Sequence, residues 1–263
     1  MTRIAVPPLS VRVPVPVEQP VYGWRYVTRA LPNGTQVRKE IPLTAADVLH
    51  PQEGDTIPEN EAQEQERGYL ACVFRYFLRH VLRVLVTSDR LVNWGIPGLG
   101  DHSPDVAVFF GIRNRKRHRR KVYLAKEKNA EAVLAVEIVS PQERDPEARR
   151  NDVVHKKQHY HQAKVRCYVI VDQEYPDGPR RLVGYRYTPS RYEKMRLDKD
   201  NRFVLAPLGI LLGLRDNRIV CYDADTGEEI LDYAGQADAR RLAEQRAERM
   251  AEQLRTLGIK SEA

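Results

Sequence analysis

Apolar residues in the middle of the chain gather in short, nearly unbroken runs. Residues 106–110, 132–139 and 167–171 are such runs, rich in β-branched and aromatic side chains. Runs of this kind are typical of strands that are buried on both faces of a sheet. We therefore predict three core strands here, with a helix over residues 145–164 between the second strand and the third.

A helical period precedes these runs. Apolar side chains recur along one face of residues 58–82, which predicts a long helix with one buried side. That face comprises Leu70, Val73, Phe74, Phe77, Leu78 and Val81. One or two strands are predicted within residues 84–94, and another at 121–125.

Turn and cap signals organise the N-terminal part of the chain. Residues 1–21 are rich in Val and Pro, which predicts an extended arm. The Asn33-Gly34 pair predicts a hairpin over residues 22–42. Thr44 is a suitable N-cap for a short helix at 43–49.

The chain after residue 172 reads as an antiparallel extension of the sheet, in which the apolar stretch 208–214 fits no single element. Its short β-type segments are residues 182–187, 192–197, 203–205 and 218–222. We expect one main domain over residues 22–233, between the N-terminal arm and a C-terminal segment at 234–263.

The C-terminal segment predicts a helix over residues 234–257. Its apolar residues alternate at spacings of four and three, a heptad seam made by Ala243, Ala247, Met250, Leu254 and Leu257. Such a seam would help to pair two chains as a homodimer. Alternatively, the helix packs on its own domain or lies in solvent.

The positive charge of the chain is local. A loop of nine residues carries seven basic side chains, which account for the whole excess of 43 basic over 36 acidic residues and so for the net charge of +7. This basic loop comprises Arg113, Arg115, Lys116, Arg117, Arg119, Arg120 and Lys121. It is either a contact for nucleic acid or a solvated connection.

Composition argues against a membrane or secreted protein. The longest apolar stretch, residues 205–214, is too short to span a bilayer, and we expect no secretory leader. The three cysteines, Cys72, Cys167 and Cys221, are scattered, which is typical of reduced thiols in a cytoplasmic protein.

Two acids stand in the apolar runs. Asp105 begins the first run and Glu137 lies near the end of the second. A buried carboxylate is costly unless a cation or hydrogen-bond donors meet it. If the two strands are neighbours, Asp105 and Glu137 would share a divalent metal ion.

A lysine on the following helix fits the same site. Val153, Lys156, Tyr160 and Ala163 share one helical stripe, whereas Lys157 points about 100° away. An inward Lys156 needs a partner such as Glu137. The alternative is that Lys156 extends to the surface along Tyr160.

Four short motifs carry a family resemblance. They are Pro104-Asp105, Glu137-Ile138-Val139-Ser140-Pro141, Asn151-Asp152 with Lys156 and Tyr160, and Tyr168-Val169-Ile170-Val171-Asp172. In this order and spacing they resemble the Uma-two family, a bacterial group described as restriction endonucleases within the PD-(D/E)XK nuclease superfamily. The resemblance covers about residues 22–232.

The resemblance implies an α/β fold with a restriction-endonuclease-like α-β-β-β-α-β core, a mixed sheet flanked by helices. It also implies Mg²⁺, with Mn²⁺ as an alternative, held by Asp105, Glu137 and the Ile138 carbonyl. The superfamily places its lysine two residues after the second acid, where this chain has Val139. Lys156 therefore replaces that lysine, or the site is inactive. Many family members have His where this chain has Gln63.

Other chemistries are disfavoured. His155, His159 and His161 lack the glutamate of a zinc protease, and neighbouring lysines would repel a metal ion. Two hypotheses remain. One is a Mg²⁺-dependent DNA endonuclease. The other is an inactive nuclease-fold protein that binds nucleic acid or acts as a scaffold.

Overall fold

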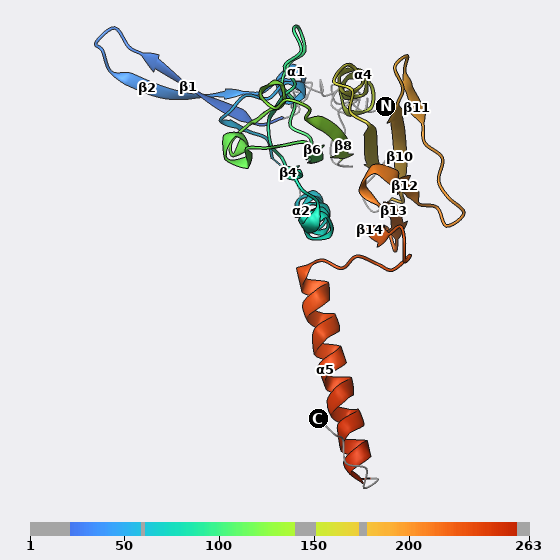
Figure 1. Ribbon diagram of the computed structural model, residues 1–263. Helices are drawn as coiled ribbons and strands as arrows, with labels where there is room; N and C mark the ends of the chain where they lie inside the picture. The colour runs from blue at the N-terminus through green and yellow to red at the C-terminus, as the bar shows by residue number, and fades with distance from the viewer. Residues whose placement is uncertain (1–21, 59–60, 140–150, 174–177, 257–263) are drawn as a thin grey trace, which may run out of the picture.

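A six-stranded mixed sheet forms the centre of the computed structural model, which describes residues 22–58, 61–139, 151–173 and 178–256 (Figure 1). Only β8 and β9 are parallel; the other neighbours in this sheet are antiparallel. The strand order is β11 (Tyr192–Lys194), β10 (Arg180–Tyr187), β9 (Cys167–Gln173), β8 (Glu131–Ile138), β6 (Val106–Phe110) and β4 (Leu85–Ser88).

Alternation along each strand divides the buried residues between two faces of the sheet. On β8, Leu134 and Val136 belong to the core that contains helix α2 (Glu61–Phe77), whereas Ala135 belongs to the opposite core. Glu137 follows the period of Ala135. It therefore points to the face opposite α2.

The α2 face carries a second layer. Helix α2 packs its buried residues there beside a three-stranded sheet. That sheet contains β12 (Phe203–Leu205), a 3₁₀ turn at Ala206–Leu208, β13 (Ile210–Arg215) and β14 (Arg218–Asp223). The ambiguous stretch 208–214 is thus mainly the central strand of this sheet.

The opposite face carries the helix that precedes β9. Its described part is a π-helical turn, Asn151–Lys156, followed by α4, Lys157–Gln162. This confirms the predicted helix, except for residues 145–150, which lie outside the described part. A parallel pair, β5 (Val92–Asn93) and β7 (Val122–Tyr123), lies nearby, followed by a 3₁₀ turn at Leu124–Lys126. The strand expected at 121–125 is therefore only two residues long.

The predicted hairpin extends away from the domain as β1 (Trp24–Ala30) and β2 (Gln36–Pro42) (Figure 1). β3 (Asp55–Thr56) pairs with its base. Helix α1 (Ala45–Leu49) begins at Thr44, which forms a complete capping box with Asp47 and confirms the predicted cap. The predicted arm of residues 1–21 lies outside the described residues.

The first long helix is shorter than expected. It ends at Phe77 and continues as a 3₁₀ turn, Leu78–His80, after which Val81 adopts an extended conformation. The prediction of Val81 as a buried helical residue is wrong, since its side chain is 41% exposed. The chain leaves the helix there because it must reverse into β4. The core strands and helices still follow the predicted α-β-β-β-α-β order, which confirms the restriction-endonuclease-like α/β fold.

Helix α5 (Tyr233–Thr256) projects from the domain, and none of its residues is buried (Figure 1). The prediction that it packs on its own domain is therefore wrong for the described helix. Leu257, the last residue of the seam, lies outside the described residues. Among the described helices, none is long and apolar enough to cross a membrane.

Candidate active site

Asp105 and Glu137 meet at the same edge of the sheet. Val106 pairs with Val136 in the antiparallel ladder of β6 and β8, so the acids next to them become neighbours. The backbone N–H of Ile138 donates to Asp105 Oδ2 at 2.6 Å. Both side chains are buried, with 9% of Asp105 and 2% of Glu137 exposed.

The helix that precedes β9 brings two donors to Glu137. Lys156 Nζ donates to Glu137 Oε2 at 2.9 Å, and the Tyr160 hydroxyl donates to Oε1 at 2.6 Å. Lys156 is itself buried, so the alternative of a lysine extended to the surface is wrong. Lys157 instead lies over the ring of Tyr185, with Nζ 4.0 Å from the ring centroid.

The backbone around Lys156 is unusual. The turn Asn151–Lys156 is π-helical, and α-helical geometry begins only at Lys157. Short π-helical segments are rare and occur often at functional sites. Because Tyr160 follows Lys156 by four residues, one α-helical turn directs both side chains at the same carboxylate.

Gln63 reaches the site from α2. Its Nε2 donates to the Ile138 carbonyl at 3.0 Å, across 75 residues of sequence. The first helix therefore touches the strand end that carries Glu137. The sequence left this contribution open, because an amide on a polar helical turn has no distinguishing signal.

The donor set fits a divalent cation. Two nearly buried carboxylates and a backbone carbonyl are hard oxygen ligands of the type that Mg²⁺ prefers. An ionised carboxylate offers about four lone-pair sites, so the hydrogen bonds from Lys156 and Tyr160 do not by themselves prevent metal coordination.

Comparison with models of known families finds one that matches this chain. The family model Uma2, described as "Putative restriction endonuclease", matches residues 55–219, more than half of the chain. The chain belongs to the Uma2 family. The match begins at β3, so the β1–β2 hairpin and α5 lie outside it.

Similarity to individual proteins is low. A crystal structure of "a putative nuclease belonging to DUF820" from Anabaena variabilis is 13% identical, with a TM-score of 0.32. The likeness covers 64% of this chain and 76% of that chain. No curated protein matches this Uma2 chain.

The basic loop of this Uma2 protein is held in place by buried hydrogen bonds. Buried His118 lies within it, with Nε2 2.9 Å from Glu127 Oε1, and the Glu127 carboxylate also accepts the backbone N–H groups of Arg113 and Asn114. The hydrogen bond from His118 is the main cause of the lowered pKa of Glu127. This buried pair holds the loop while six basic side chains stay exposed around it.

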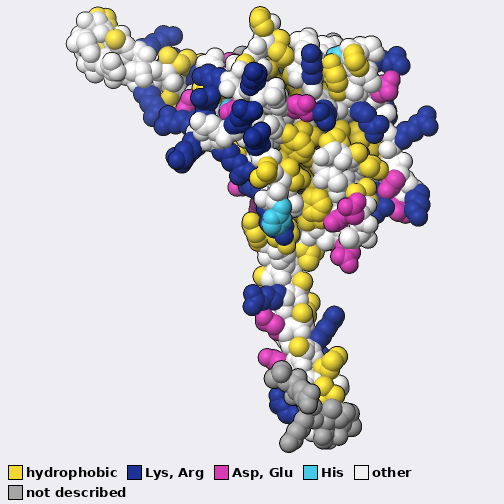
Figure 2. Space-filling model, in the orientation of Figure 1, with side chains coloured by type: hydrophobic (Ala, Val, Ile, Leu, Met, Phe, Trp, Pro, Cys, Tyr) yellow, Lys and Arg dark blue, Asp and Glu magenta, His cyan; other side chains and the backbone are white. Residues whose placement is uncertain are grey.

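The exposed members of the loop are Arg113, Arg115, Lys116, Arg117, Arg119 and Arg120. The seventh, Lys121, is half-buried and forms an ion pair with Asp101. Arg120 lies 3.9 Å from Glu53, which places the loop beside the base of the hairpin. Figure 2 shows many Lys and Arg side chains on the part of the surface where the hairpin meets the domain.

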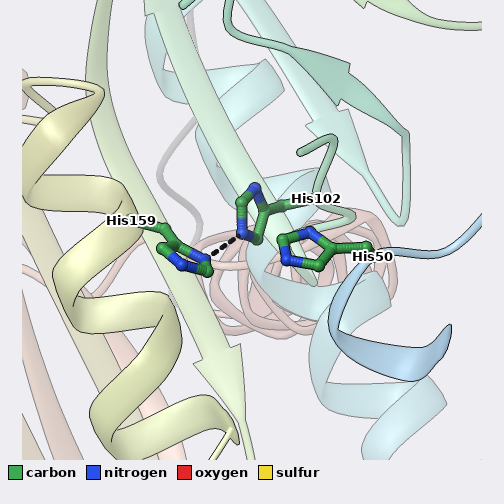
Figure 3. Close-up of side chains that lie close together, drawn as sticks. All are labelled: His50, His102 and His159. Carbon is green, nitrogen blue, oxygen red and sulfur yellow. Dashed lines mark hydrogen bonds between the residues drawn. The ribbon is translucent and has the colours of Figure 1, made fainter. Parts of the chain in front are cut away.

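The two histidines of α4 contact residues outside the His155, His159 and His161 group that was considered as a zinc site. His161 Nε2 contacts the Thr188 carbonyl at 2.9 Å. His159 joins His50 and His102, and one ring nitrogen from each lies within 4.8 Å of the others (Figure 3). His50 and His102 lie far from α4 in sequence, so the helical spacing could not reveal this cluster.

Proposed function

We propose that this Uma2 protein is a Mg²⁺-dependent endonuclease that hydrolyses DNA phosphodiester bonds, with Mn²⁺ as an alternative metal. Asp105, Glu137 and the Ile138 carbonyl would hold the metal, and Gln63 would orient that carbonyl. When bound, the metal supplies Lewis-acid stabilisation of the phosphate and lowers the pKa of a coordinated water.

The contact between Lys156 Nζ and Glu137 Oε2 carries this proposal. It supports Lys156 as the replacement for the lysine that Val139 cannot provide. From this position, the ammonium would orient the attacking water or stabilise negative charge on the pentavalent phosphate. Tyr160 would fix the orientation of Glu137 by its hydrogen bond to the other carboxylate oxygen.

DNA is the proposed substrate because the exposed basic loop offers phosphate contacts beside the domain. Other Lys and Arg side chains gather on the same part of the surface, where the hairpin meets the domain (Figure 2). The three cysteines are free, which supports a reducing compartment such as the cytoplasm.

The test is cleavage of supercoiled plasmid, single-stranded DNA and RNA in Mg²⁺, Mn²⁺ or EDTA. Asp105→Asn and Glu137→Gln should abolish metal-dependent cleavage. Lys156→Met should slow cleavage by about 10²-fold or more, as for loss of a donor that acts on developing charge. Calorimetry should show that Lys156→Met still binds Mg²⁺, whereas the acid variants bind it weakly.

Lys157→Met is the matched control, because Lys157 is the next residue and lies over Tyr185 instead. It should cleave like the wild type. The alternative function, nucleic-acid binding without catalysis, is favoured by the exposed basic loop, which needs no intact acid pair. DNA binding without cleavage in any metal, unchanged by Glu137→Gln, would establish that alternative.

A further inference from the structure

Three histidines from separate segments lie close together, next to Tyr160 of the proposed active site. His50 ends α1, His102 lies on the approach to β6, and His159 belongs to α4 (Figure 3). The ring centroids of His50 and His102 are 4.9 Å apart, and those of His102 and His159 are also 4.9 Å apart. The His102 side chain is fully buried.

Hydrogen bonds define the proton positions in this cluster. The buried indole N–H of Trp94 donates to His102 Nδ1 at 2.9 Å, so that nitrogen carries no proton. The neutral ring therefore carries its proton on Nε2, which donates to His159 Nδ1 at 2.8 Å. His50 Nδ1 lies 3.1 Å from the Asp101 carbonyl and carries the proton of its own ring.

These bonds disfavour a metal ion at the cluster. Both ring nitrogens of His102 already form hydrogen bonds, Nδ1 as an acceptor and Nε2 as a donor. A metal on Nε2 would move the proton to Nδ1, where it would face the Trp94 N–H and leave that buried donor without its acceptor. The positive charge of Lys156 also acts on His102 and opposes a second cation there.

The hydrogen-bonded chain joins the two parts of the proposed site. His102 is three residues before Asp105, and His159 lies between Lys156 and Tyr160 on the same helix. The Tyr160 ring packs against both Trp94 and His102, with centroid distances of 5.5 and 5.4 Å. A shift of α4 would therefore move both donors away from Glu137.

We propose that the chain Trp94–His102–His159 is a positioning element of this site. It holds α4, and with it Lys156 and Tyr160, against the strands that carry Asp105 and Glu137, and it holds only while both imidazoles are neutral. The catalytic consequence rests on the proposed nuclease function, whereas the positioning of α4 does not.

Protonation breaks the chain by placing two donors face to face. A second proton on His102 would meet the Trp94 N–H, and a proton on His159 Nδ1 would meet His102 Nε2–H. Burial is the main cause of the low pKa of both rings, about 2 for His102. His50 and Lys156 lower the pKa of His102 further, and His50 and His155 lower that of His159, whereas a backbone hydrogen bond with Gly100 acts in the opposite direction on His102.

Two substitutions at one position separate positioning from simple stability. In His159→Asn, the side-chain oxygen can stand where Nδ1 stood and accept from His102, without titrating. In His159→Gln, the oxygen lies one carbon further out and misses that place. His80→Asn, on an exposed turn far along the chain, is the control for loss of an imidazole.

Hydrogen exchange of the α4 amides gives a readout that needs no activity. Exchange at residues 157–162 should speed up by about tenfold or more in His159→Gln, as for local opening of a helix, and should remain near wild type in His159→Asn and His80→Asn. Equal α4 exchange in the wild type and in His159→Gln would overturn the proposal, whether or not the protein cleaves DNA.

Cleavage adds the functional readout. His159→Gln should lower kcat by about 10- to 100-fold with little change in KM, as expected for a misplaced catalytic group. The acid limb of the rate profile should move to lower pH in His159→Asn. If the wild type cleaves DNA and His159→Gln has the same kcat, the positioning role is wrong.

Tryptophan fluorescence and zinc titration complete the test. Trp24→Phe leaves Trp94 as the single tryptophan, and its emission should change on acidification in step with α4 exchange. Adding Zn²⁺ should produce no stoichiometric binding. Tight binding of one Zn²⁺ that is lost in His102→Asn would overturn the hydrogen-bonded chain in favour of a metal centre.

Discussion

Lys156→Met should destabilise the protein strongly in the absence of metal. The side chains of Lys156 and Glu137 are only 10% and 3% exposed, and their charged atoms are 2.9 Å apart. Methionine keeps most of the length and apolar stem of lysine but removes the charge. The substitution therefore takes away the cation that compensates a buried carboxylate, while leaving only a small change in packing.

The magnitude follows from the burial of this pair. Breaking a buried ion pair by removing one partner costs about 3–5 kcal/mol, because the remaining charge is held away from water. Little discount for solvent screening applies, since both groups are nearly inaccessible. A loss of this size is a large fraction of the roughly 5–15 kcal/mol that stabilises a typical domain.

Urea denaturation in EDTA at neutral pH measures the effect. The midpoint should fall by about 1 M or more at an unchanged slope of roughly 3 kcal/mol/M. Lys157→Met is the control and should cost only about 1 kcal/mol, because it removes a single half-buried cation–π interaction with the Tyr185 ring and leaves no buried charge without its counter-ion.

A double variant tests the cause. Glu137→Gln combined with Lys156→Met removes both charges and should recover most of the lost stability, since a neutral pair carries no uncompensated charge. Mg²⁺ should also stabilise Lys156→Met more than it stabilises the double variant. A loss below about 1 kcal/mol in EDTA, or no recovery in the double variant, would refute this reasoning.

Three further predictions concern other parts of the chain. Neutralising several exposed residues of the basic loop should weaken DNA binding. It should also reduce the slope of the logarithm of the binding constant against the logarithm of the salt concentration by about 0.9 for each phosphate that the loop no longer neutralises. An unchanged slope would make the loop a solvated connection. The protein should be a homodimer, helped by the seam of α5 at Ala243, Ala247, Met250 and Leu254, none of which is buried, or by a symmetric surface of the domain. Light scattering that detects only monomer at micromolar concentration would contradict this. Because burial lowers the pKa of His102 to about 2, the unfolded chain takes up its proton first as pH falls below about 6.5. The stability that neutral His102 contributes should therefore be fully present above that pH. Below it, this group should lower the free energy of unfolding by up to about 1.4 kcal/mol per pH unit, and His102→Phe should flatten the decline.

The sequence by itself determined the elements and the charged core of the site. Unbroken apolar runs predicted β6, β8 and β9, because a strand that is buried on both faces is apolar at nearly every position. The two acids stood out because such runs exclude charge. The helical period placed Lys156, rather than Lys157, on the inward face.

Other local signals were also enough to predict single elements. Asn33-Gly34 marked the turn of the β1–β2 hairpin, and Thr44 marked the start of α1. Each is a preference of a few consecutive residues, so it needs no knowledge of the rest of the chain. The same local reading failed at Val81, where helical spacing continued past the point at which the chain must turn into β4.

Only the tertiary structure decided which distant residues complete the site. Gln63 reaches Ile138 across 75 residues, and His102 meets His159 across 57. Nothing in the period around either residue indicates its partner. These contacts depend on the register of β6 against β8 and on the packing of α2 and α4 on opposite faces of the sheet, which are properties of the folded chain as a whole. A hydrogen bond acts over about 3 Å, so a polar residue acquires its role only when packing has brought its partner within that distance.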